Sequence, residues 1–127
     1  MKARGRALAA AILITAAASI AQAQTAADPM ADAGGAAFQN ELGCGSCHFK
    51  DSTFAPPLEG IVGRKIAAVP GFLYSAALKA KGGAWTDARL DAFLASPQDF
   101  APGSGMDARV EDPAKRRQVI AYLKTLK

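Results

Sequence analysis

Metal-binding and catalytic side chains are scarce in this 127-residue sequence, which contains two cysteines, one histidine and one tryptophan. A structural zinc site needs about four nitrogen or sulfur ligands, so a closed site here would require carboxylates as well. One histidine cannot supply two imidazole ligands to the same metal ion. No Ser/His/Asp set and no pair of carboxylates lies near the cysteines, so the sequence gives no sign of a catalytic acid, base or nucleophile.

Long apolar runs are also few, and the main one, Ala7–Ile20, is 14 residues long. A helix that spans a bilayer needs about 20 apolar residues. Lys2, Arg4 and Arg6 precede the run, and the small-x-small sequence Ala21–Ala23 follows it. This pattern is typical of a cleavable secretory signal peptide. We therefore expect residues 1–23 to direct export to the periplasm; the alternative is an uncleaved membrane anchor.

The expected mature chain, residues 24–127, has almost no net charge. The full sequence carries a net charge of +4, but three of its basic residues lie in the signal segment, which leaves 12 basic and 11 acidic residues. Nothing indicates binding to nucleic acid. The remaining 104 residues form one small domain, with a core over about 33–125. A domain of this size buries a limited apolar core, so a bound cofactor would supply much of the missing volume.

The residues Cys44-Gly45-Ser46-Cys47-His48 match C-x-x-C-H, the attachment motif of c-type haem. In this motif each thiol forms a thioether with one vinyl group, and the histidine is directed at the iron. The alternatives are a disulfide, a thioredoxin-like redox pair and a zinc site. A redox pair is expected in a βαβ setting, whereas this motif has Ala-, Gly- and Pro-rich surroundings without strand-like runs. A disulfide would leave His48 unexplained.

Hydrophobic periodicity and breaker residues predict an all-α class with long loops and no strand. Residues 24–31, including Met30, are expected to be an irregular lead-in, and Ser96-Pro97 is expected to end a helix. The basic residues 115–117 are expected to form a solvated helix face. The expected helices cover 32–42, 74–81, 86–95 and a last helix that begins after Asp112, and the expected loops cover 49–72 and 101–112. Long loops in a small domain are usually functional, and here they would wrap a central haem.

From about Gly35 to Lys124 the chain resembles the class I c-type cytochromes, in the branch of the mitochondrial carrier and its bacterial counterparts. The matching segments, in family order, are CGSCH (44–48), APPLEGIVGRK (55–65), VPGFLYS (69–75), KGGAW (81–85), LDAFLASPQDFAPGSGM (90–106) and VIAYLK (119–124). The resemblance implies the small cytochrome c fold, with three to five helices around one covalent haem c. It also implies a soluble, monomeric one-electron carrier that is not an enzyme and docks transiently with redox partner proteins at the haem edge.

The family's site residues transfer position by position. Cys44 and Cys47 would hold the haem, and His48 and Met106 would be the axial iron ligands. The Pro56 carbonyl would accept a hydrogen bond from the other nitrogen of the His48 ring. Three further residues would bind a haem propionate by hydrogen bonds or charge: Arg64, Tyr74 and Trp85. Phe38 and Tyr122 would lie where the first and last helices cross.

The chain departs from the family pattern in its distal pocket and at its haem edge. Phe93 and Leu78 replace a tyrosine and an asparagine, which predicts a more apolar distal side. Relatives place a ring of lysines at the haem edge, whereas this chain has Gly43, Gln98, Asp99, Gly105 and Asp112 there. We therefore expect docking that depends little on charge. Two alternatives stay open: a dedicated cytochrome subunit of a periplasmic dehydrogenase, or a haem peroxidase or small-ligand sensor if Met106 is not a firm ligand.

Overall fold

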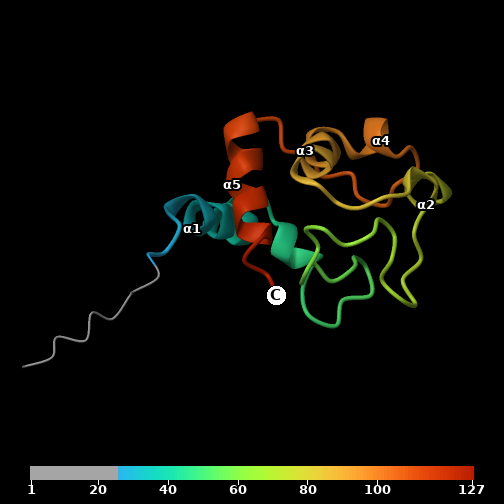
Figure 1. Cartoon of the computed structure of the whole chain (residues 1–127), viewed down its shortest axis with the longest axis horizontal. Coiled ribbons are helices and arrows are strands. Elements are labelled where there is room, and N and C mark those ends of the chain that lie inside the picture. Colours follow the sequence, from blue (N-terminus) through green and yellow to red (C-terminus); the bar gives the residue numbers. More distant parts are fainter. Residues whose placement is uncertain (1–25) are drawn as a thin grey trace, which may run out of the picture.

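The computed structural model describes residues 26–127, so the predicted signal peptide lies outside the described residues. This part contains five α-helices, a short π-helical turn η1 (Ala37–Glu41) and a 3₁₀ turn η2 (Cys44–Ser46) (Figure 1). The helices are α1 (Pro29–Ala36), α2 (Ala76–Lys81), α3 (Asp87–Ala95), α4 (Pro97–Phe100) and α5 (Pro113–Leu123). Residues 26–127 contain no strand, only an isolated bridge between Lys65 and Ala84. The predicted all-α class is confirmed, and so is the long irregular segment between η2 and α2.

The first and last helices pack across one another at the N-terminal side of the domain (Figure 1). Gly34 is buried there, directly against the backbone of Gln118 in α5. The rings of Phe38 and Tyr122 meet beside this contact, with centroids 5.3 Å apart. Buried residues of α5, among them Val119 and Ile120, continue the contact into the core. This crossing lies next to η1, which leads into the turn that carries the C-x-x-C-H motif.

The start of α1 corrects the expectation for the lead-in, because Pro29 and Met30 belong to the helix. The Asp28 carboxylate accepts a hydrogen bond of 2.9 Å from the Met30 N–H, and Pro29 occupies the first turn. An aspartate before a proline is a strong helix start, since the side chain satisfies a free N–H and proline has none to lose. Asp112 and Pro113 begin α5 in the same way.

Ser96 and Pro97 end α3 as expected, but a helix that was not predicted begins at Pro97. The chain does leave α3 at Ala95, as predicted, but Pro97 immediately starts the short helix α4. Pro97 is fully buried, and the Ala101 N–H donates to its carbonyl at 2.8 Å. Proline therefore ends one helix and begins the next, and α4 ends directly before the loop that contains Met106.

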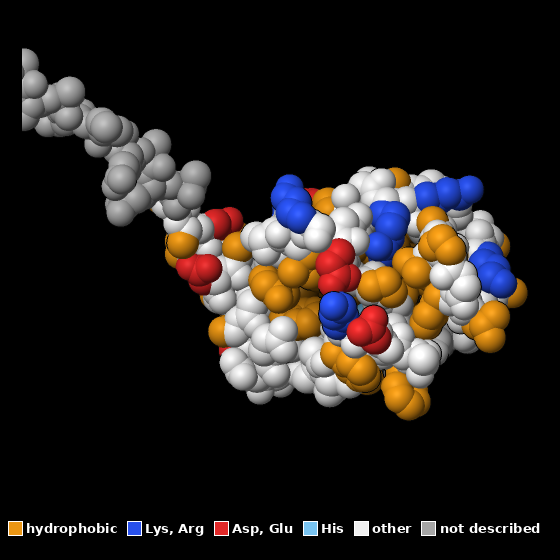
Figure 2. All heavy atoms as spheres, turned by 90° about the horizontal axis from the view of Figure 1, so that it is seen from below, with side chains coloured by type: hydrophobic (Ala, Val, Ile, Leu, Met, Phe, Trp, Pro, Cys, Tyr) orange, Lys and Arg blue, Asp and Glu red, His pale blue; other side chains and the backbone are white. Residues whose placement is uncertain are grey.

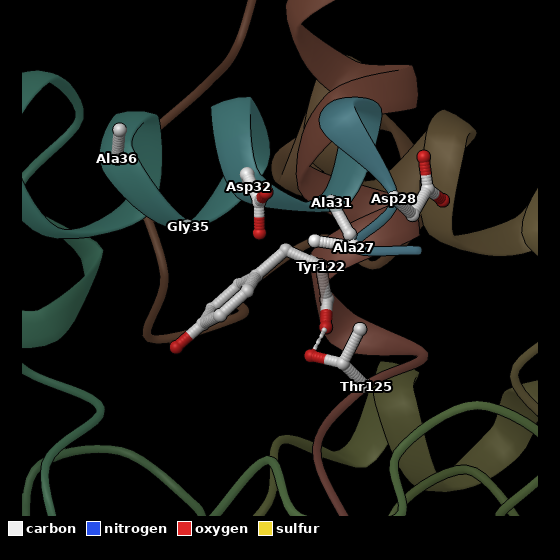
Figure 3. A pocket seen from close by; sticks show the side chains of 8 residues that line it. All are labelled: Ala27, Asp28, Ala31, Asp32, Gly35, Ala36, Tyr122 and Thr125. Carbon is white, nitrogen blue, oxygen red and sulfur yellow. Dashed lines mark hydrogen bonds between the residues drawn. The ribbon is translucent and has the colours of Figure 1, made fainter. Parts of the chain in front are cut away.

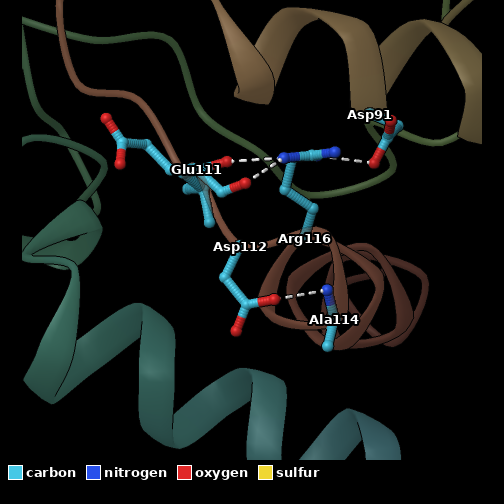
Figure 4. Close-up of polar contacts among 6 residues, drawn as sticks. Asp91, Glu111, Asp112, Ala114 and Arg116 are labelled. Atoms are coloured by element: carbon cyan, nitrogen blue, oxygen red, sulfur yellow. Dashed lines mark hydrogen bonds and ion pairs between the residues drawn. The ribbon is translucent and has the colours of Figure 1, made fainter.

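The basic residues 115–117 are not simply a solvated face. Arg116 donates through Nε to the Asp91 carboxylate of α3 at 2.7 Å, and through Nη1 to the backbone carbonyls of Val110 and Glu111, both at 2.8 Å (Figure 4). Its side chain is 13% exposed. Lys115 pairs with Glu41 at the other side of the helix. Arg116 thus joins α3, α5 and the segment that follows the Met106 loop.

Candidate functional site: a covalent haem centre

The C-x-x-C-H motif forms one tight turn. Gly43 takes a left-handed conformation with φ of 65°, which glycine adopts without a steric penalty. The backbone N–H groups of Cys47 and His48 both donate to the Cys44 carbonyl, at 3.2 and 2.9 Å. The turn therefore fixes the spacing of both thiols and of the imidazole.

Both thiols are free, with Cys44 half-buried and Cys47 exposed. Burial raises the pKa of Cys44, an effect that its own backbone N–H opposes and the neighbouring Cys47 reinforces. Reactive thiols of redox enzymes have lowered pKa values. The environment of Cys44 therefore argues against a thioredoxin-like pair. In the described part of the chain, no three His, Cys, Asp or Glu side chains gather as they would around zinc.

The imidazole of His48 is held by the loop that follows it. Its Nδ1 lies 2.9 Å from the Pro56 carbonyl, which can only accept, so Nδ1 carries the proton and donates. Burial lowers the pKa of His48, and the hydrogen bond to Pro56 partly opposes this. The neutral ring therefore keeps the lone pair on Nε2, the arrangement that a metal-binding histidine requires.

The three residues assigned to a propionate lie in one region. Arg64 and Trp85 are joined by a backbone hydrogen bond, in which the Trp85 N–H donates to the Arg64 carbonyl at 2.9 Å. Burial raises the pKa of Tyr74, while a hydrogen bond from the Val69 backbone and the nearby charge of Arg64 oppose this effect. Tyr74 and Arg64 are thus close enough to interact electrostatically.

Arg64 also has a role that the sequence did not reveal. Its guanidinium donates to the backbone carbonyls of Pro57 and Glu59, at 2.8 and 2.9 Å. These residues lie one and three positions after Pro56, which accepts the hydrogen bond from the His48 ring. Arg64 therefore stabilises the segment that orients the histidine, in addition to lying beside Tyr74 and Trp85.

The residues expected on the distal side of the haem form an apolar cluster. Trp85 packs against Phe93 and Phe100, with ring centroids 5.2 and 5.7 Å away, and the two phenylalanines meet edge to face. Leu78 is buried in the same core, and Met106 packs half-buried against it. The two departures from the family pattern, Phe93 and Leu78, thus lie in an apolar cluster, in line with the expected apolar pocket.

Two hollows border the described part of the chain. The larger, about 420 Å³, lies against α1 and the end of α5, where Tyr122, Asp32 and Thr125 line it (Figure 3). It contains none of the predicted site residues. The smaller, about 240 Å³, includes His48, Phe49 and Leu58. Because His48 lines the smaller hollow, we take that hollow, and not the larger one, as part of the candidate site.

The residues present fit a c-type haem. Two free thiols stand on one turn at the spacing of the attachment motif, and the histidine beside them is neutral with Nε2 available.

The sequence analysis did not anticipate a polar contact near Met106. The buried Ser104 hydroxyl accepts a hydrogen bond of 3.3 Å from the Met106 N–H. A serine two residues before a loop residue is a known turn-forming pattern, which could have indicated it.

No protein-family model matches the chain. It is 48% identical over 73 residues to a cytochrome c of Trypanosoma brucei brucei, a match covering 57% of this chain and 78% of the relative. It is 45% identical over 86 residues to the cytochrome c-type cyt cy of Rhodobacter capsulatus, covering 65% of this chain but only 43% of that longer protein.

A solved structure agrees with these matches. Cytochrome cH from Methylobacterium extorquens superposes with a TM-score of 0.68 at 40% sequence identity, covering 75% of this chain and 97% of that one. The fold, the C-x-x-C-H turn and these relatives lead to one assignment. The chain belongs to the class I c-type cytochromes, the family whose cofactor is a single covalently bound haem c.

Proposed function

We propose that this protein is a one-electron carrier of the periplasm, with His48 and Met106 as axial ligands of its haem. The observation that carries the proposal is the hydrogen bond between His48 Nδ1 and the Pro56 carbonyl, which prepares Nε2 for iron. When bound, the haem supplies a reversible ferric–ferrous couple. Cys44 and Cys47 anchor it, and the apolar cluster around Trp85 excludes water from its distal side.

Export rests on the composition of residues 1–23, which read as a cleavable signal peptide. Within residues 26–127, no helix has the length and apolarity needed to cross a bilayer. We infer that the protein acts after export as a monomer. N-terminal sequencing of the purified protein tests the predicted cleavage of the signal peptide, with Gln24 expected as the first residue; a retained N-terminus would contradict it.

Docking with redox partners is proposed to rely on apolar contact more than on charge. Figure 2 shows a face on which basic and acidic side chains both occur, among apolar and uncharged ones. Large apolar side chains project into solvent next to the motif and in the following loops: Phe49 is 49% exposed, Phe54 83% and Leu73 90%. Such contacts suit brief encounters, whose interfaces bury less than roughly 1,200 Å².

The first test is an absorption spectrum of the purified protein in both redox states. Ferric haem with a methionine ligand has a weak band in the red, and we expect this band in the wild type and its loss in Met106→Ala. Covalent attachment should survive in that variant, because Cys44 and Cys47 are unchanged. A ferric protein that contains haem but lacks the band would refute methionine ligation and favour ligand binding or peroxidase activity.

A dedicated cytochrome subunit of a periplasmic dehydrogenase is the second candidate, favoured by the same weakly charged surface. The two functions differ in the lifetime of the complex. Purification from the native periplasm at moderate salt should give the protein alone if it is a free carrier, and a stoichiometric complex with a larger enzyme if it is a subunit.

A further inference from the structure

Gln98 bridges a fixed helix and the loop that contains Met106. Its side chain is half-buried on α4, whose base is anchored by the fully buried Pro97 and by Ala101, which is 0% exposed. The loop beyond is mostly exposed, and Gly103 in it has φ of 78°. The loop itself therefore contributes little apolar burial to hold its own shape.

The Gln98 amide bonds to the loop at both of its ends. Its Oε1 accepts from the Gly103 N–H at 3.0 Å, and its Nε2 donates to the Ser104 carbonyl at 2.8 Å and to the Asp107 carboxylate at 3.0 Å. The Met106 carbonyl lies 3.4 Å from the same nitrogen. The Gln98 Nε2 can only donate and the Oε1 can only accept, so these partners fix the orientation of the amide.

These contacts surround Met106 on both sides in the sequence. Ser104, whose carbonyl Gln98 binds, also accepts the Met106 N–H through its hydroxyl. Asp107 is the next residue after the methionine. One side chain thus ties down the residues before and after the proposed ligand, without touching the sulfur.

We propose that Gln98 is a positioning residue for the sixth iron ligand: its amide holds the 103–107 loop in the conformation that keeps Met106 on the iron. The inference rests on the proposed function, because it concerns the strength of the Met106–iron bond. An exogenous ligand can take the sixth position only while Met106 is away, so the apparent affinity for that ligand measures how often the loop opens.

The test is a titration of the ferric holoprotein with imidazole, followed by loss of the red methionine band. Gln98→Ala removes three hydrogen bonds to the loop, and each contributes modestly in net terms. We expect the variant to bind imidazole roughly 10- to 100-fold more tightly than the wild type. Asp107→Ala removes one of the three bonds and should give a smaller increase, about 2- to 10-fold. Asp99→Asn, an exposed neighbour on α4, is the matched control and should behave as the wild type.

The outcomes separate the two proposals. If the wild type shows the methionine band and Gln98→Ala binds imidazole as the wild type does, the positioning role is overturned and the proposed function stays intact. A wild-type protein without the band would overturn both. Should Gln98→Ala fail to accumulate, Asp107→Ala alone decides: a gain in affinity supports the role, and an affinity equal to that of Asp99→Asn refutes it. Guanidinium unfolding gives the free energy of unfolding of each variant. If the effect is local to the loop, this free energy must change less than the free energy of imidazole binding.

Discussion

A methyl group added at Gly34 would collide with the backbone of α5, so Gly34→Ala should destabilise the fold strongly. A Cβ there would overlap the Gln118 carbonyl oxygen and lie 2.5 Å from its carbon and 2.9 Å from Tyr122 Cβ. Ordinary carbon–carbon contacts are about 3.5–4.0 Å. The two helices must therefore separate by roughly 1 Å, because a backbone carbonyl cannot rotate away as a side-chain tip can.

The magnitude follows from two opposing effects. Alanine favours a helix over glycine by about 1 kcal/mol. Overpacking a tight contact typically costs about 1–3 kcal/mol, and more where backbone has to shift. Separation would also loosen the packing of Phe38 and Val119, which are nearly inaccessible to solvent. Because backbone has to shift here, we take a cost of about 3–4 kcal/mol, which leaves a net loss of about 2–3 kcal/mol of unfolding free energy, or a fall in Tm of roughly 8–24 °C.

The neighbouring position supplies the matched control. A Cβ at Gly35 would lie 3.1 Å from Cδ2 of the Tyr122 ring, which can tilt away. Gly35→Ala should therefore change the unfolding free energy by less than about 1 kcal/mol, because the helix-propensity gain offsets a small steric strain. Guanidinium titration followed by far-ultraviolet circular dichroism measures both variants. Equal stability of Gly34→Ala and Gly35→Ala would refute the close backbone contact between α1 and α5.

Four further predictions concern other parts of the protein. Arg116→Met should lower the unfolding free energy by about 1–3 kcal/mol, since it leaves two backbone carbonyls without their charged donor; the exposed Arg117→Met is the control, and equal effects would show that the Arg116 contacts add nothing. Phe93→Tyr should shift the reduction potential by adding a hydroxyl to the apolar cluster beside Trp85, and an unchanged potential in redox titration would show that this pocket does not tune the haem. Burial raises the pKa of Tyr74, so the folded state favours its protonated form, and stability should decline as pH rises above about 10; Tyr74→Phe should flatten this decline in pH-dependent denaturation. Reduction by the native partner should depend weakly on salt, and stopped-flow rates that fall steeply with ionic strength would contradict the proposed apolar docking.

Local signals explain where the sequence predicted helices well. Thr86 caps α3, with its hydroxyl accepting from the Arg89 N–H, and Asp112 with Pro113 starts α5 as expected. The same Asp-Pro signal at Asp28 was present in the sequence, but the Ala- and Gly-rich residues around it gave no apolar periodicity, and the start of α1 was placed too late. The Asp28-Pro29 pair indicated the true start of α1, but the apolar periodicity, on which the prediction relied, was too weak there to show it.

Side-chain contacts between distant segments could not be read in this way. Arg116 and Asp91 lie 25 positions apart, and the sequence contains nothing that pairs them. Arg64 was assigned to a propionate from its place in a motif, but its hydrogen bonds to Pro57 and Glu59 depend on how the loop folds back. Gln98 drew notice only as an uncharged residue where relatives have lysine, and its bonds to Gly103 and Asp107 emerge only in three dimensions.

The sequence by itself determined the covalent chemistry and the class of fold. Two cysteines and a histidine at fixed spacing specify haem attachment, because the reacting atoms lie within one turn of backbone. Periodicity and breakers specify helices joined by long loops for the same local reason. The tertiary structure alone decided how Arg64 supports the segment after Pro56 and how Gln98 bonds to the Met106 loop. Each of these depends on hydrogen bonds whose partners meet only after the chain has folded.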